Sequence, residues 1–135
     1  MELQIKQLIN QFLRRLLVRK APPLESMSEE MLLNYALDLA QEWGDNWMQP
    51  IQPRLKTAFP GLNEQKLNRL NYVAQSAVKF GQELTLSMAE KEGVKNLNAT
   101  NWRATFLKKF QWADEKNLKR LYTTGTYQAM KRGFL

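Results

Sequence analysis

Apolar residues recur every three or four positions through most of the chain, which is the spacing of an α-helix that buries one face. At the start of the chain this pattern runs from Leu3 to Leu17, and Pro22 with Pro23 then prevents a helix from continuing. We therefore predict a first helix over residues 2–20 whose apolar face packs into a bundle. The alternating pattern of a β-strand does not occur in the sequence.

Two further helices are predicted around a proline-rich connection. Ser26 or Ser28 is suited to cap the first of them, which we expect to end near Met48. Its predicted buried stripe consists of Leu32, Tyr35, Ala36, Leu39 and Trp43. The second is a short piece of one or two turns that begins at Pro53, because proline is tolerated in the first turn of a helix.

The longest helix is predicted over residues 63–92. Its apolar positions keep a 3-4-3-4 spacing at Leu67, Leu70, Ala74, Ala77, Gly81, Leu84 and Met88. Val73 and Phe80 form a second apolar flank, which favours a central position with several neighbours. The small residues of the first flank would allow a partner helix to approach closely.

Two helices are predicted in the last third of the chain. Asn98 or Thr100 would cap the first, and Asp114 would cap the second. With 135 residues the chain suits one domain. The predicted fold is therefore all-α: a single-domain bundle over residues 1–135, with about five main helices and one long central helix.

Missing residue types exclude most common catalytic sites. The chain has no cysteine and no histidine, so it lacks thiolate ligands, disulfides, and the usual general base near neutral pH. Adjacent acids such as Glu29–Glu30 and Asp114–Glu115 lie at predicted helix starts, where capping and the helix dipole explain them. We expect no enzyme activity, no catalytic residues, no metal, no cofactor and no small-molecule substrate.

Nothing in the sequence resembles a targeting or membrane-spanning segment. Charged residues interrupt the apolar face of the first predicted helix, unlike the core of a secretory signal. No apolar run approaches the roughly 20 residues needed to span a bilayer. We expect a cytoplasmic protein that does not bind membranes.

The charge is unevenly distributed along the chain. The formal net charge is +7, and residues 1–20 carry five basic residues and one acidic residue. Residues 21–94 carry six basic and ten acidic residues, whereas residues 95–135 carry nine basic and two acidic ones. Basic ends around an acidic middle suit a partner with two different electrostatic faces.

The basic ends supply candidate ligands for nucleic-acid phosphates. The candidates are Arg14, Arg15, Arg19, Arg103, Lys108, Lys109, Lys116, Lys119, Arg120, Lys131 and Arg132. Proteins that bind nucleic acid need cations at phosphate spacing, and those that hold single strands add aromatic side chains for stacking. Trp112 and Tyr127 are the aromatic residues that we expect to be exposed. The competing interpretation is a solvated basic face with the aromatic residues in the core.

An acidic row forms a second candidate surface. Asp38, Glu42 and Asp45 fall on one face of the second predicted helix, away from its apolar stripe. Metal sites in helical bundles project inward and usually include histidine, so this row does not predict a metal site. We interpret it as a solvated acidic face; the alternative is a surface that docks a basic neighbour, either another protein subunit or the basic end of a further copy of the chain.

A histidine-free basic helical chain of this size resembles the small subunits of CRISPR–Cas effector complexes, and also the helical C-terminal domain of their large subunits. The residues that carry the resemblance are the segment 101–110, from Asn101-Trp102-Arg103 to Lys108-Lys109-Phe110, and the segment 116–120. The resemblance implies several copies along a guide-RNA complex that serves antiviral defence. It implies basic faces that stabilise the target or displaced strand, an acidic face against a neighbouring subunit, and no catalysis.

The sequence is compatible with two functions of different kinds, one based on nucleic-acid binding and one on protein–protein interaction. The first is a non-catalytic subunit of a ribonucleoprotein that binds DNA or RNA through backbone phosphates. The alternative is a protein-interaction module, such as an adaptor, inhibitor or assembly factor, that works through the acidic helix over residues 29–47.

Overall fold

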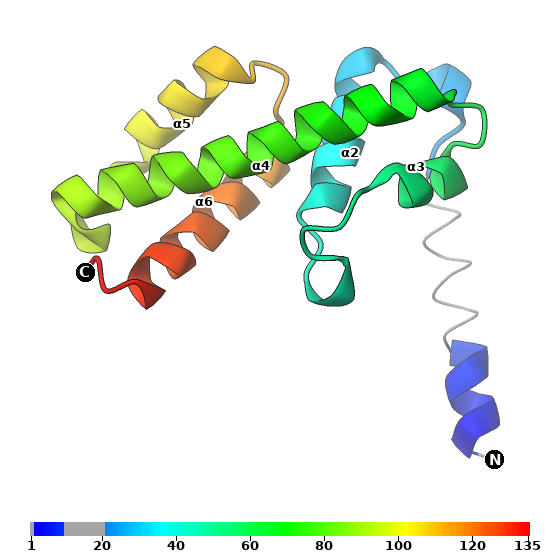
Figure 1. Ribbon diagram of the computed structural model, residues 1–135, viewed down its shortest axis with the longest axis horizontal. Coiled ribbons are helices and arrows are strands. Elements are labelled where there is room, and N and C mark those ends of the chain that lie inside the picture. The colour runs from blue at the N-terminus through cyan, green and yellow to red at the C-terminus, as the bar shows by residue number, and fades with distance from the viewer. Residues whose placement is uncertain (1, 10–20) are drawn as a thin grey trace.

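The computed structural model describes residues 2–9 and 21–135, and all regular structure in these ranges is helical (Figure 1). Residues 2–9 form a short helix. It is followed by α2 (Glu29–Ala40), α3 (Gln52–Ala58), α4 (Glu64–Glu92), α5 (Ala99–Lys109) and α6 (Glu115–Lys131). The prediction of an all-α bundle with one long central helix is confirmed. Within the described ranges, no helix is both long and apolar enough to cross a membrane.

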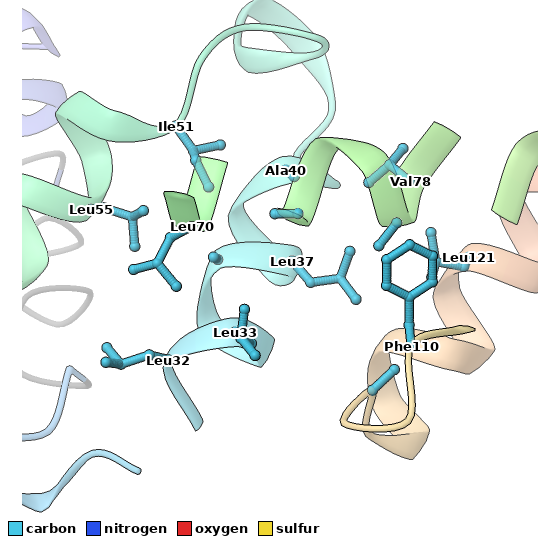
Figure 2. Packing of buried hydrophobic residues seen from close by; sticks show 14 of the residues in the cluster. Leu32, Leu33, Leu37, Ala40, Ile51, Leu55, Leu70, Val78, Phe110 and Leu121 are labelled. Carbon is cyan, nitrogen blue, oxygen red and sulfur yellow. The ribbon is translucent and has the colours of Figure 1, made fainter. Parts of the chain in front are cut away.

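The helix α4 is the spine of the bundle. Figure 1 shows α2 and α3 beside the N-terminal half of α4, and α5 and α6 beside its C-terminal half. This arrangement explains why the sequence of α4 is apolar on two flanks, since each flank faces different neighbours. The core runs along α4, with Leu55 and Leu70 buried at one end and Phe110 buried at the other (Figure 2).

Side-chain caps fix where four of the helices begin. Ser28, Asn63, Asn98 and Asp114 each accept a hydrogen bond from the backbone N–H three residues later. A cap of this kind contributes about 1 kcal/mol, because it satisfies a backbone donor that the helix itself leaves free. The structure selects Ser28 over Ser26 and Asn98 over Thr100, and it confirms Asp114 as the cap of the last helix.

The predicted end of the second helix is wrong. The helix α2 ends at Ala40, not near Met48, and a short 3₁₀ turn spans Gly44–Asn46. Gly44 has φ +82°, a left-handed conformation that ends regular helix and that glycine adopts most easily. Trp43, which we expected in the buried stripe, lies beyond the end of α2 with an extended backbone (φ −86°, ψ 170°) and is 55% exposed.

The first predicted helix also differs from expectation in its described part. Leu3, Ile5, Leu8 and Ile9, which should have packed into the bundle, are all exposed. The core is already closed by residues from α2 to α6 without them. The rest of that predicted helix, with Arg14, Arg15 and Arg19, lies outside the described residues.

The helices α4 and α6 are in close contact where Gly125 faces Thr85. Thr85 is fully buried; its Oγ1 accepts a hydrogen bond from Nε1 of Trp102 at 2.9 Å and donates one to the Gly81 carbonyl at 2.8 Å. A Cβ atom on Gly125 would lie 2.5 Å from that Oγ1. The contact between the helices therefore requires glycine at position 125. The Thr85 side chain that faces it is held in place by its two hydrogen bonds.

Gly125→Ala should destabilise the fold. Overpacking of this kind costs about 1–3 kcal/mol, whereas the gain in helix propensity is at most about 1 kcal/mol. Urea unfolding should show a net loss of stability. A second change, Thr85→Ala, should make the Gly125→Ala penalty smaller, because it removes Oγ1 and Cγ2, two of the three Thr85 atoms that the new Cβ would crowd. A stability equal to or above that of the wild type would contradict this packing.

Candidate nucleic-acid interface

A groove runs along the outer face of α6. Its walls are formed by Trp43, Lys116, Lys119, Arg120, Thr123, Thr124 and Tyr127, and we call it the α6 groove. Positions 116, 120, 123 and 127 are three or four residues apart, so they form one stripe on the helix. The stripe is about 16 Å long at 1.5 Å per residue.

Two aromatic side chains lie in the groove with much of their surface exposed. Tyr127 is 52% exposed and Trp43 is 55% exposed. Trp43 comes from the connection between α2 and α3, and it stacks on the half-buried Trp47 with ring centres 5.0 Å apart and planes 10° apart. The sequence predicted the exposure of Tyr127; it did not predict that of Trp43, and Trp112 is half-buried.

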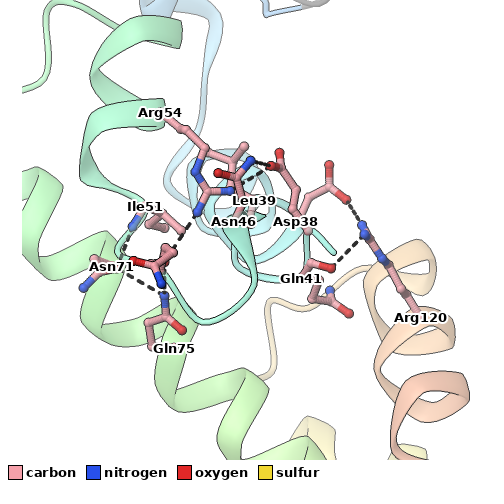
Figure 3. Close-up of polar contacts among 11 residues, drawn as sticks. Asp38, Leu39, Gln41, Asn46, Ile51, Arg54, Asn71, Gln75 and Arg120 are labelled. Atoms are coloured by element: carbon pink, nitrogen blue, oxygen red, sulfur yellow. Dashed lines mark hydrogen bonds and ion pairs between the residues drawn. The ribbon is translucent and has the colours of Figure 1, made fainter. Parts of the chain in front are cut away.

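An ion pair holds the connection that carries Trp43. Arg54 Nη1 lies 2.9 Å from Glu42 Oε2 and also donates to the Leu39 carbonyl at 2.9 Å (Figure 3). Asn46 Nδ2 donates to the same carboxylate oxygen at 2.8 Å. These bonds attach both sides of the turn to α3, so the connection that carries Trp43 is held in place.

Arg120 joins α6 to the end of α2. Its Nη1 lies 2.9 Å from Asp38 Oδ1, and its Nη2 donates to the Gln41 carbonyl at 2.8 Å (Figure 3). The charge of Arg120 is thus met within the chain, and its geometry fixes the two walls of the groove relative to each other. Unlike the lysines of the groove, Arg120 therefore has a carboxylate partner in the same chain.

The acidic row is mostly occupied by these contacts. Asp38 and Glu42 pair with arginines of the same chain, while Asp45 is exposed and has no ion pair among the described residues. Burial raises the pKa of the nearby Tyr35 phenol above its ordinary value, and the Asp38 and Glu42 carboxylates raise this pKa further. Tyr35 is consequently a neutral packing residue at physiological pH.

The basic residues of α5 point to other surfaces. Arg103 pairs with Glu115 across a second hollow between α5 and α6, which Lys119 also lines. Lys109 Nζ lies 4.6 Å from the ring centre of Phe80 on α4, a cation–π contact. Lys108 is exposed. The structure therefore does not bring the α5 cations into the α6 groove.

Beyond the groove, two more cations lie at the C-terminal end of α6. Lys131 Nζ lies 5.3 Å from the ring centre of Tyr127, so it continues the basic stripe. Arg132 caps the helix and is exposed. Of the predicted phosphate ligands, Lys116, Lys119 and Lys131 thus share one face of α6, and in the described residues none of them has a carboxylate partner.

The described residues contain no cluster of three or more acidic side chains that could hold a metal ion. The α6 groove combines lysine ammonium groups, threonine hydroxyls, the indole of Trp43 and the phenol ring of Tyr127. Such a surface is suited to bind a polyanion that also carries flat aromatic groups. Comparisons of the chain with protein-family models, curated proteins and solved structures gave no significant match.

Proposed function

We propose that this chain is a non-catalytic nucleic-acid-binding subunit that holds the phosphate backbone of DNA or RNA in the α6 groove. The proposal rests on one observation: three lysines of α6, Lys116, Lys119 and Lys131, lie on one face of the helix beside the exposed Trp43 and Tyr127. Lysines that neutralise phosphates release condensed counterions, which provides affinity without sequence preference.

The same proposal includes other protein subunits as partners. Backbone contacts from one groove give weak binding, and several copies on one strand would raise the effective affinity. A place in a multi-subunit ribonucleoprotein, as in the CRISPR effector complexes that the chain resembles, would provide such copies. The exposed apolar residues of the helix over residues 2–9 offer a further contact surface for a neighbouring subunit.

The direct test is charge reversal in the groove. Lys116→Glu with Lys119→Glu should weaken binding to a labelled single-stranded oligonucleotide on the order of 30-fold near 0.1 M salt, because about two phosphate contacts are lost. A matched control is Lys79→Glu with Lys91→Glu, which reverses two exposed lysines of α4 that do not line the groove. Equal effects of the two pairs would show that only net charge matters and would reject the groove as the site.

Neutralising Asp38 should have the opposite effect. Asp38→Asn keeps an oxygen that accepts a hydrogen bond from Arg120 but leaves the guanidinium charge uncompensated at the groove wall. Affinity for the same oligonucleotide should rise about threefold to eightfold, the contribution of roughly one added phosphate contact. Unchanged or weaker binding, with a folded variant, would contradict the electrostatic model.

That variant also separates the two functions considered from the sequence. If the acidic helix were the working surface, Asp38→Asn would impair capture of a protein partner and leave nucleic-acid binding unchanged. The structure favours the nucleic-acid proposal, since two of the three carboxylates in the acidic row already have partners in the same chain.

A further inference from the structure

We infer that the α6 groove is a site for unpaired nucleotides, in which a base stacks on Trp43 while the adjacent phosphates contact Lys116 and Lys119. The inference rests on the proposed function and deepens it, because it selects single-stranded over duplex nucleic acid. The groove brings together the two kinds of group that a single strand requires: cations and exposed ring faces.

The exposure of Trp43 is the first support. Trp43 is 55% exposed, whereas Trp102 is 1% exposed. Trp43 leaves the end of α2 and presents its indole at the rim of a basic groove. An indole in this position loses contact with the core, and a flat apolar ligand would cover the exposed surface.

The support beneath Trp43 is the second. Trp47 stacks against Trp43, and Trp47 lines a small interior cavity with Gln41, Val78 and Leu121. Trp43 and Trp47 flank a short turn, and the ion pair of Glu42 with Arg54 links the start of this turn to α3. Because the indole is already held in place, less conformational entropy is lost when a base stacks on it.

The α6 groove offers both ammonium groups and aromatic ring faces, and this combination distinguishes between possible polyanionic ligands. In a duplex the faces of the bases are covered by their neighbours, so an indole at the groove rim would meet only phosphates and sugar. An acidic protein segment would satisfy the lysines but would leave Trp43 and Tyr127 without flat partners. A single strand offers unstacked bases and phosphates in turn, and the stripe of about 16 Å suits a few nucleotides.

The experiment compares single strand with duplex on the full chain. The probes are a labelled deoxythymidine oligonucleotide of about 20 nucleotides and a blunt duplex of the same length, measured by fluorescence anisotropy at low salt. Trp43→Ala and Tyr127→Ala remove the ring faces of the groove, and Trp43→Phe retains a stacking surface. Tyr72→Ala is the matched control, because Tyr72 is an aromatic residue of α4, 73% exposed, that does not line the groove.

The inference predicts that the wild type prefers the single strand. Trp43→Ala should weaken single-strand binding by about 5-fold to 150-fold, the range that loss of one base–aromatic stack produces. It should leave duplex binding unchanged, and Trp43→Phe should recover most of the lost affinity. Tyr72→Ala should stay within about twofold of the wild type for both probes. Circular dichroism of each variant checks that the helices are retained.

Three results would overturn the inference. If single strand and duplex bind equally and Trp43→Ala changes neither, while the Lys116 and Lys119 reversals weaken both, the groove binds phosphates only and the proposed function stands. If polyglutamate competes as effectively as oligodeoxythymidine at equal charge, the groove recognises charge without bases. If neither oligonucleotide binds at low salt, the proposed function fails together with the inference.

Discussion

Trp102→Ala should lower the free energy of unfolding by about 3–5 kcal/mol, the usual cost of removing a buried tryptophan. The indole is 1% exposed and contacts α4, α5 and α6 at once. It stacks on Phe106 with ring centres 5.3 Å apart, meets Tyr122 edge-on, and donates to Thr85. Truncation therefore leaves both a cavity and a buried hydroxyl without its donor.

The matched control is Trp43→Ala, the same substitution at an exposed tryptophan. It should change stability by no more than about 0.5–1 kcal/mol, since the lost contacts are mainly the stack on Trp47. Urea unfolding followed by circular dichroism measures both variants. Equal losses for the two tryptophans would contradict the assignment of Trp102 to the core and of Trp43 to the surface.

Asn117→Leu should cost about 2–4 kcal/mol, although leucine is similar in size and more apolar. Asn117 is 2% exposed and connects α6 to α2. Its Oδ1 accepts from Gln41 Nε2 at 2.9 Å, and its Nδ2 donates to the Asn34 carbonyl at 3.0 Å. Leucine would leave the Nε2 donor of Gln41, a side chain that is 3% exposed, without its partner.

A double variant tests whether the network, rather than packing, causes this loss. Gln41→Leu with Asn117→Leu removes both partners, so no donor is left unsatisfied, and the pair should be less destabilised than Asn117→Leu alone. Chemical denaturation of the two single variants and the double variant gives the coupling energy. Additive losses would show that the hydrogen bond between the two amides contributes little.

Local rules were sufficient for most of the fold. The apolar period of α4, the capping residues Asn63 and Asp114, and the proline that opens α3 all act within a few residues of the chain. The error at the end of α2 is local as well. Trp43 fits the helical apolar period, but α2 already ends at Ala40, and Trp43 has an extended backbone (φ −86°, ψ 170°) just before the left-handed Gly44.

The candidate site could be predicted only in part. Charge counting identified Lys116, Lys119 and Lys131, because the outward positions of a predicted helix can be found without tertiary information. The pairing of Arg120 with Asp38 joins residues 82 positions apart, and the sequence gives no sign of it. The two arginines Arg103 and Arg120 were therefore counted as free ligands, although carboxylates of the same chain meet their charge.

Salt dependence of binding tests most directly whether α6 cations engage phosphates. The dissociation constant for oligodeoxythymidine should be measured between about 50 and 200 mM salt for the wild type and for Lys116→Gln with Lys119→Gln. For the wild type, the association constant (the reciprocal of that dissociation constant) should fall with a log–log slope of about −2 to −3, because each single-strand phosphate contributes about −0.7. In the double variant the slope should become shallower by about 1.4. A slope near zero, or the same slope in both proteins, would contradict binding through the α6 groove.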